Sequence, residues 1–174
     1  MIKDEIEELS EEYIMFSNNG IFENFISLPE FENAKTIFAY ISEKREPDTE
    51  RIIRKALEMG KTVALPISYD NGRMEPHIIK NLDELVSGKY GIPAPKNDAP
   101  ILKDEDIELI IVPAVTFDRN GFRLGRGGGY YDRFLEKSEA FSVGLGRERL
   151  IREIPLLPHD MSVSCLVTEA GIFK

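Results

Sequence analysis

The residues best suited to chemistry lie together in residues 112–135, VPAVTFDRNGFRLGRGGGYYDRFL. Gly125, Gly127, Gly128 and Gly129 fall within five positions of one another. Glycine lets a backbone turn sharply, and it lets a ligand approach the main chain with no Cβ in the way. Consecutive N–H groups that run into the start of a helix form a concave site for an anion. The pattern therefore predicts a site for a phosphate-bearing small molecule.

The local charge supports an anion site. Residues 118–133 contain more arginines than aspartates, although the whole chain has a net charge of −9. These are Arg119, Arg123, Arg126 and Arg133 against Asp118 and Asp132. An exposed helix end attracts an anion by only about 0.3–1 kcal/mol, so we expect the arginines to supply much of the affinity. The alternative is a glycine-rich turn with solvated arginines, since neither a GK[ST] nor a GxGxxG motif is present.

A strand and a helix must position this segment. Glu108–Val112 (ELIIV) is short and apolar, as is typical of a buried strand, and YYDRF predicts the start of a helix. Ligands of open α/β sheets bind at the carboxyl ends of strands, which is where this segment lies.

Further strands and helices predict an α/β fold with a largely parallel sheet. Strands are expected at Thr36–Ile41, Thr62–Leu65, Ser142–Gly144 and Val163–Thr168, with a weaker strand at Met74–Ile78. The first two flank a helix with Asp48 or Thr49 as its N-cap and Gly60 just past its end, which indicates a parallel pair. Asn81 and Glu84 resemble a capping box, and residues 88–106 read as irregular connection.

The N-terminal region predicts two helices. One apolar stripe is formed by Ile2, Ile6, Leu9, Tyr13 and Phe16, and Asn18-Asn19-Gly20 is expected to end that helix. A second, short helix is expected to carry Ile21, Phe22, Phe25 and Ile26.

Composition limits the class of protein. A chain of 174 residues suits a single domain over residues 1–174, and its acidic charge argues against nucleic-acid and anionic membrane partners. The single cysteine, Cys165, excludes an internal disulfide and is expected to be a buried thiol. No apolar run is long enough to cross a membrane and no secretory signal is seen, so we expect a cytoplasmic protein.

Residues 112–135 resemble the diagnostic segment of 5-formyltetrahydrofolate cyclo-ligases, also called methenyltetrahydrofolate synthetases. The similarity runs almost position for position through Phe117-Asp118, Gly121, Arg123-Leu124-Gly125, Gly127, Gly129 and Tyr130-Tyr131-Asp132. It continues more loosely through Asp48-Thr49, Val63-Ala64-Leu65-Pro66, Tyr90-Gly91-Ile92-Pro93 and Pro158-His159-Asp160. The resemblance implies a three-layer α/β/α sandwich of Rossmann-like type.

The resemblance also implies a reaction and its cofactors, ATP and Mg²⁺. 5-Formyltetrahydrofolate, with or without a polyglutamate tail, is expected to be closed to 5,10-methenyltetrahydrofolate with release of ADP and phosphate. The intermediate is an iminium phosphate, and the protein is expected to be a monomer. The alternatives are a non-catalytic relative that binds folate or nucleotide, and a transferase or isomerase on a similar fold that acts on sugar phosphates or CoA esters.

Site residues follow from the same resemblance. The ATP-binding set is Arg123, Leu124, Gly125, Arg126, Gly127, Gly128, Gly129, Tyr130 and Tyr131. The folate-binding set is Ile41, Glu46, Gly127, Gly128, Gly129 and Tyr130. Arg126 and Tyr131 are the catalytic candidates, and Asp132 is the Mg²⁺ candidate. The plain alternatives are an acid in the first turn of a helix for Asp132, a surface acid for Glu46, and core packing for Ile41 and for one of the two tyrosines.

Three positions depart from the family pattern. Lys3 is the only early cation where relatives carry a basic helix that reaches the ATP phosphates. Gly128 stands where some relatives have lysine, and Ser164 where some have an acidic metal ligand. We therefore expect reduced affinity for ATP.

Overall fold

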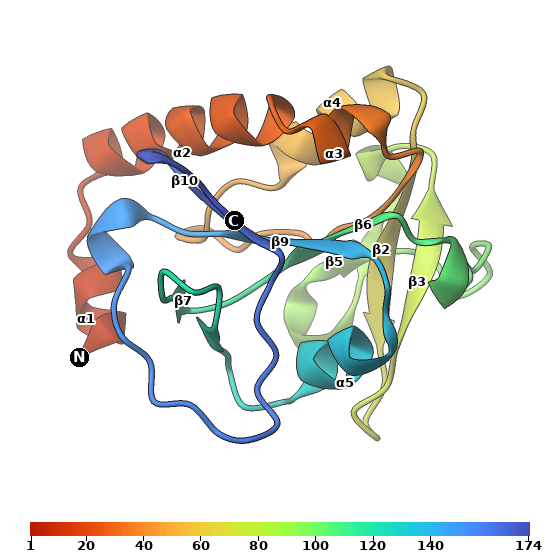
Figure 1. Cartoon of the computed structure of the whole chain (residues 1–174). Coiled ribbons are helices and arrows are strands. Elements are labelled where there is room, and N and C mark those ends of the chain that lie inside the picture. Colours follow the sequence, from red (N-terminus) through yellow and green to blue (C-terminus); the bar gives the residue numbers. More distant parts are fainter.

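The computed structural model describes residues 1–174, and a seven-stranded sheet forms its centre (Figure 1). The strand order is β11-β10-β9-β6-β1-β2-β3. The strands are β1 (Thr36–Phe38), β2 (Thr62–Ser68), β3 (Met74–Ile79), β6 (Leu109–Val112), β9 (Phe141–Leu145), β10 (Cys165–Thr168) and β11 (Gly171–Phe173). The inner strands pair in parallel, and the edge strands β3 and β11 pair antiparallel. The predicted α/β fold with a largely parallel sheet is confirmed.

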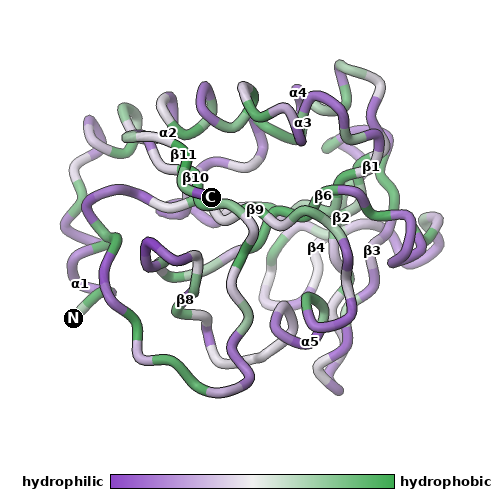
Figure 2. The backbone as a smooth tube through the Cα atoms, in the orientation of Figure 1, coloured by the Kyte–Doolittle hydropathy of each residue, from purple (hydrophilic) through white to green (hydrophobic).

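Alternation of side chains along the inner strands divides the core into two faces. In β6, Leu109 and Ile111 belong to one buried cluster, and Ile110 and Val112 belong to the other. The parallel strands are apolar on both faces, as expected for a sheet covered on both sides. Figure 2 shows the same distribution, with hydrophobic colour along the central strands and hydrophilic colour concentrated in the outer turns.

Helices cover both faces of the sheet (Figure 1). The helices on one face are α2 (Glu11–Ile26), α3 (Pro29–Asn33) and α4 (Glu50–Glu58), whose buried side chains join the larger apolar cluster. The opposite face packs against α5 (Tyr130–Lys137) and a hairpin of β7 (Thr116–Phe117) and β8 (Arg123–Leu124). A second hairpin pairs β4 (Val86–Ser87) with β5 (Pro93–Ala94). Four 3₁₀ turns complete the fold: η1 (Leu82–Glu84), η2 (Lys89–Gly91), η3 (Asp104–Asp106) and η4 (Glu148–Leu150).

The N-terminal helices differ from the prediction. The first apolar stripe is divided between α1 (Ile2–Glu7) and α2, because Ser10 caps α2 by accepting a hydrogen bond from the N–H of Tyr13 (3.1 Å). Helix α2 then continues through Asn18-Asn19-Gly20. Gly20 serves close packing there, since a Cβ at this position would lie 2.7 Å from the Cβ of Glu169. Phe16, placed on the inward stripe by the sequence, is 64% exposed.

Several element boundaries also differ. Strand β1 ends at Phe38 and not at Ile41, and β2 extends beyond Leu65 to Ser68. Asn81 caps a single 3₁₀ turn. Half of the predicted capping box forms, because the Asn81 side chain accepts the N–H of Glu84 (3.2 Å), but the Glu84 carboxylate accepts the N–H of Lys80 and not that of Asn81. The region 88–106 contains short elements, and α3, β7, β8 and β11 were not predicted.

The structure shows how Asp48 and Thr49, the two candidates for the N-cap of α4, are used. Thr49 occupies the N-cap position, but its side-chain oxygen donates to the Tyr40 carbonyl (2.5 Å) and accepts the Ser42 N–H (2.9 Å). Asp48 instead accepts the N–H of Glu50 (3.0 Å). Gly60 follows the helix with φ +77°, as expected for a residue just past a helix end.

The order of the strands creates a switch point between β1 and β6. From β1 the chain proceeds outward to β2, whereas from β6 it proceeds in the other direction to β9 and β10. The carboxyl ends of β1 and β6 therefore diverge at the edge where ligands of such sheets bind. None of the helices has the length and apolar character needed to span a membrane.

Candidate active site

A cavity of about 1250 Å³ lies at the carboxyl ends of β1, β2 and β6. Its walls come from Tyr40 and Ile41 after β1, from Pro66–Tyr69 at the end of β2, and from Pro113 and Ala114 after β6. Residues 123–132 form a further wall. All members of the predicted ATP, folate and Mg²⁺ sets line this one cavity, although they come from distant parts of the sequence.

The glycine loop between β8 and α5 presents unpaired backbone donors. None of the N–H groups from Gly125 to Asp132 donates a hydrogen bond to a backbone carbonyl. Gly127 and Gly129 adopt left-handed φ values of +91° and +66°, and a Cβ at Gly127 would meet no atom within 4 Å. Loop and helix start together form a concave row of donors, which fits the phosphate groups of a nucleotide.

Arg126 lies between two carboxylates. Its Nη2 is 2.5 Å from Oε2 of Glu43 and 2.9 Å from Oε1 of Glu46. The Glu46 side chain is only 17% exposed, and its Oε2 accepts the N–H of Glu43 (2.7 Å). The sequence predicted both Arg126 and Glu46 as site residues, and the structure brings them into direct contact.

The backbone that carries Glu46 is held from behind by Arg147. This guanidinium is 2% exposed and donates to the carbonyls of Glu46 (2.9 Å) and Arg45 (3.3 Å). Burial lowers the pKa of Arg147, and the carbonyl groups around it accept its N–H groups in place of a carboxylate. Arg147 therefore fixes the segment that presents Glu43 and Glu46 to the cavity.

Burial shifts the acid–base properties of groups around Glu46. It raises the pKa of Glu46, an effect that Arg126 opposes. Burial and the nearby Glu46 charge also raise the pKa of the Tyr40 and Tyr131 phenols. Both phenols therefore stay protonated at neutral pH and can donate hydrogen bonds.

Asp132 forms an ion pair with Arg123 at the start of α5. Arg123 Nη2 is 2.6 Å from Oδ1 of Asp132, and Arg123 Nη1 donates to the Met161 carbonyl (2.9 Å). Oδ2 of Asp132 has no protein partner, and no group of three acidic, histidine or cysteine side chains surrounds it. One free carboxylate oxygen beside a phosphate cradle fits Mg²⁺, which takes one or two carboxylates together with phosphate oxygens and waters.

Tyr130 and Arg133 fasten the loop. The Tyr130 hydroxyl donates to the Tyr69 carbonyl (3.0 Å), and Arg133 donates to the carbonyls of Gly128 (2.6 Å) and Gly72 (3.2 Å). These contacts tie the loop to the β2–β3 turn, so Arg133 anchors the loop and is not free to bind a ligand.

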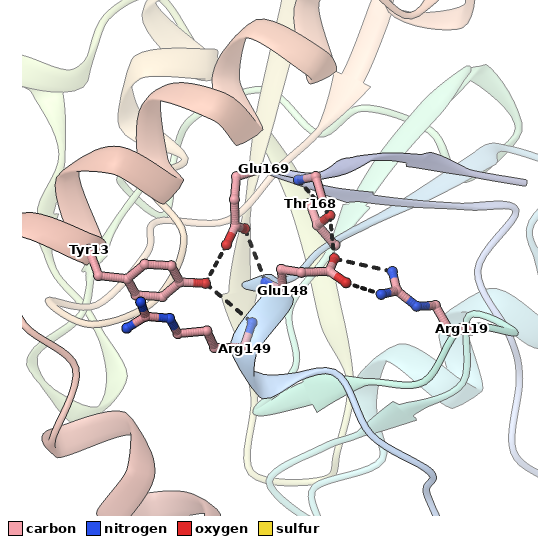
Figure 3. A network of polar contacts seen from close by, with 7 residues as sticks. Tyr13, Arg119, Glu148, Arg149, Thr168 and Glu169 are labelled. Atoms are coloured by element: carbon pink, nitrogen blue, oxygen red, sulfur yellow. Dashed lines mark hydrogen bonds and ion pairs between the residues drawn. The ribbon is translucent and has the colours of Figure 1, made fainter.

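Arg119 lies outside the cavity, contrary to its expected contribution to anion binding. It pairs with Glu148, which also accepts the hydroxyl of Thr168 (2.8 Å), as Figure 3 shows. The same network continues through Glu169 to Tyr13 of α2, and the Tyr13 hydroxyl accepts the N–H of Arg149 (3.2 Å). Arg119 thus anchors the turn of the β7–β8 hairpin to the end of β10.

Sequence reasoning missed several residues of the cavity wall. Tyr40, Tyr69, Lys89 and Lys96 all line it. Lys89 pairs with Asp70 (3.0 Å) and donates to the Tyr130 hydroxyl (3.4 Å). The one sequence feature that could have indicated them is the family-like segment Tyr90-Gly91-Ile92-Pro93. This segment has no regular periodicity, so the sequence did not predict its structure. The main chain at Tyr90 adopts φ +60°, an uncommon conformation for a tyrosine.

A second cavity of about 830 Å³ adjoins the first and contains the early cation. Lys3 of α1 lies in its wall, as do Gly125 and Arg126. Glu43, Glu46, Leu124, Gly125 and Arg126 line both cavities and separate them. Ser164 lines neither cavity and exchanges hydrogen bonds with Ser142 (2.8 and 3.1 Å), in keeping with its exclusion from the predicted metal site.

Comparisons with known proteins agree on one family. The model of the 5-formyltetrahydrofolate cyclo-ligase family matches residues 2–169. A probable 5-formyltetrahydrofolate cyclo-ligase of Schizosaccharomyces pombe is 31% identical over 96% of this chain and 91% of its own length. The 5-formyltetrahydrofolate cyclo-ligase of Escherichia coli is 29% identical over 86% of each chain.

Solved structures give the same result. The 5,10-methenyltetrahydrofolate synthetase of Aquifex aeolicus superposes with a TM-score of 0.85 at 29% identity and covers 99% of this chain and 88% of its own. The synthetase of Mycoplasma pneumoniae superposes with a TM-score of 0.78 at 17% identity, which is a likeness of fold alone.

Proposed function

Because the chain belongs to the 5-formyltetrahydrofolate cyclo-ligase family and is an enzyme of that kind, we propose that it closes its folate substrate at the expense of ATP. The products are 5,10-methenyltetrahydrofolate, ADP and phosphate. The observation that carries this proposal is the free row of N–H donors at residues 125–132, which lines the same cavity as Glu46, the partner of Arg126.

The two adjoining cavities support a reaction between two ligands. The larger one contains Ile41, Glu46 and Tyr130, which are the groups suited to a flat, hydrogen-bonding pterin. The second contains Lys3 and Arg126, which suit a polyphosphate. Because Gly125 and Arg126 border both, a phosphate bound to the loop lies next to a folate in the larger cavity.

The proposed chemistry begins at the formyl oxygen of the folate. This oxygen takes the γ-phosphoryl group of ATP to give an iminium phosphate and ADP. N10 then bonds to the same carbon and gives up its proton, and the C–O bond breaks so that the phosphate leaves with that proton. Transfer of the phosphoryl group converts the formyl oxygen from a poor leaving group into a good one. The task of the protein is therefore mainly to position two ligands and to neutralise charge.

Each side chain has a separate role in this scheme. The loop N–H groups and Arg123 orient the phosphates, and Arg126 neutralises the charge that moves with the transferred group. Glu46 accepts hydrogen bonds from the pterin N–H groups. The protonated Tyr131 phenol is suited to donate to a phosphate or formyl oxygen.

Mg²⁺ would be held by Oδ2 of Asp132 together with phosphate oxygens and water. When bound, it supplies positive charge that offsets the charge of the phosphates. Asp132 is oriented by Arg123, whose side chain is itself 5% exposed.

The non-catalytic alternative has less support, since the relatives are named as cyclo-ligases. The monomeric state, the single domain, the cytoplasmic location and the acceptance of polyglutamate tails remain predictions. So does the absence of nucleic-acid and membrane partners.

A direct assay tests the proposal. Purified protein is mixed with 5-formyltetrahydrofolate, ATP and Mg²⁺, and absorbance of the methenyl product is followed together with ADP release. We expect one ADP for each methenyl group formed and no product without ATP. Folded protein that forms no product, or that forms product without consuming ATP, would contradict the proposal.

A further inference from the structure

Glu43 has no assigned role, yet it makes a shorter contact with Arg126 than Glu46 does. The Nη2 atom of Arg126 is shared between Oε2 of Glu43 at 2.5 Å and Oε1 of Glu46 at 2.9 Å. Glu43, Glu46 and Arg126 line both cavities, and we call the wall that they form the partition. Without ligands, therefore, the cation suited to the phosphates is engaged by carboxylates.

The two carboxylates hold Arg126 unequally. Glu43 is 48% exposed, and an ion pair this exposed contributes little free energy. Glu46 is 17% exposed, and a carboxylate this buried loses much more when its cation leaves. The Glu46–Arg126 contact is thus the one that either ligand must disturb.

Each ligand competes with this contact from one side. A phosphate attracts the Arg126 guanidinium, and a pterin N–H donates to the Glu46 carboxylate in place of the Arg126 Nη2. The ligand that binds first weakens the ion pair between Glu46 and Arg126. The residue of the pair that this ligand does not bind is then available to the second ligand. A coupling of this kind is reciprocal, so both ligands must gain the same factor.

We propose that the Glu43–Arg126–Glu46 cluster couples the two sites, so that folate and nucleotide each tighten the binding of the other. Glu43 acts as a positioning residue that retains Arg126 on the partition until a phosphate takes it. This inference rests on the proposed function, because it assigns folate to Glu46 and phosphate to Arg126.

Isothermal titration tests the coupling. The Kd of a non-hydrolysable ATP analogue is measured with and without saturating 5-formyltetrahydrofolate, and the reverse titration is also made. We expect both dissociation constants to fall by one common factor, in the range of about 5–150-fold that is typical of coupled sites. If both ligands bind but the coupling factor is one, or if each ligand weakens the binding of the other, the coupling is overturned. Either result leaves the proposed function standing. If neither ligand binds to folded protein, both proposals fail.

Two variants assign the coupling to this cluster. Glu46→Gln removes the charge that holds Arg126, so the coupling factor should fall toward one. A factor unchanged from wild type would mean that the ligands couple through direct contact with each other, and would overturn the proposal.

Glu43→Gln removes only the exposed competitor for Arg126. We expect the nucleotide alone to bind about two- to fivefold more tightly, as suits a weak surface pair, while the Kd of folate alone does not change. Glu50→Gln is the matched control, because Glu50 is a similarly exposed acid that pairs with Arg54 and lines neither cavity. Tighter nucleotide binding in both variants, or in neither, would contradict the role of Glu43. Circular dichroism on each variant confirms that it is folded.

Discussion

Arg126 and Glu46 show how few side chains need to be positioned for this chemistry. One guanidinium and one largely buried carboxylate pair where the two cavities meet, and both side chains line both cavities. Their sequence separation is large, but the strand order brings the end of β1 beside the glycine loop. At this scale the function depends on two charged side chains, Arg126 and Glu46, that lie in a partly desolvated cavity wall.

Replacing Arg126 with alanine should lower kcat by about 10²–10³-fold, the cost of removing one group that stabilises transition-state charge. The measurement is steady-state formation of the methenyl product. Arg54→Ala removes the same charge from the exposed surface of α4, outside both cavities, and should keep kcat within about twofold of wild type. Equal losses in the two variants would mean that net charge, and not Arg126, is responsible.

The affinity for folate should fall as pH falls through the pKa of Glu46, which burial raises above 4.5. Only the ionised carboxylate accepts pterin hydrogen bonds, so binding weakens on the acid side, by at most about tenfold per pH unit. Tyr40 and Tyr131 do not titrate there, because the pKa of each phenol is raised.

Folate titrations at a series of pH values, in wild type and in Glu46→Gln, measure this effect. The wild-type Kd should rise at a higher pH than for an exposed glutamate. The variant should lose that dependence. A pH profile shared by both proteins would show that another group titrates.

At the scale of elements, the glycine loop works because its conformation leaves backbone donors free. The hairpin before it is anchored through Arg119 and Glu148 (Figure 3), and the helix after it supplies further N–H groups. Arg133 and Tyr130 fix the loop to the β2–β3 turn. The loop can therefore keep the shape that receives a phosphate before the ligand arrives.

Gly127→Ala should weaken nucleotide binding, since alanine at φ +91° costs about 1–2 kcal/mol although no atom blocks its Cβ. Gly60→Ala is the matched control, because Gly60 has φ +77°, open space around it and a position at the end of α4. We expect both variants to lose similar stability in urea denaturation. Only Gly127→Ala should lose nucleotide affinity, and a loss of affinity in Gly60→Ala as well would point to general destabilisation.

The sequence predicted the elements that have strong local signals and missed those set by tertiary contacts. The apolar strands and Gly60 could be read directly, whereas Gly20 looked like a helix stop because its packing against Glu169 is invisible in the sequence. The edge strand β11 and the short hairpins are too brief to show periodicity. In the site, the glycine loop was evident, but no local pattern distinguishes Glu43 and Lys89 from other charged residues, and only the fold places them at the cavity.

At the scale of the whole molecule, a mixed sheet has helices on both of its faces (Figure 1). The two cavities lie at its carboxyl edge. The two apolar clusters on either side of the sheet make this edge rigid enough to orient two ligands. The acidic chain places its arginines at this edge and in anchoring pairs.

Ligands should therefore stabilise the whole fold. By mass action, either ligand at 100 times its Kd should add about 2.7 kcal/mol to the free energy of unfolding. A thermal-shift panel measures this, with folates and adenine nucleotides expected to raise Tm and sugar phosphates or CoA esters expected to leave it unchanged. A rise with sugar phosphates alone would favour a different enzyme on the same fold.

The most direct measurement of the central claim is a crystal structure with a non-hydrolysable ATP analogue and 5-formyltetrahydrofolate. The account predicts triphosphate oxygens within hydrogen-bond distance of the N–H groups of residues 125–132. It also predicts the γ-phosphate beside Arg126 and the pterin at Glu46. A complex with the nucleotide bound elsewhere and this loop empty would contradict it.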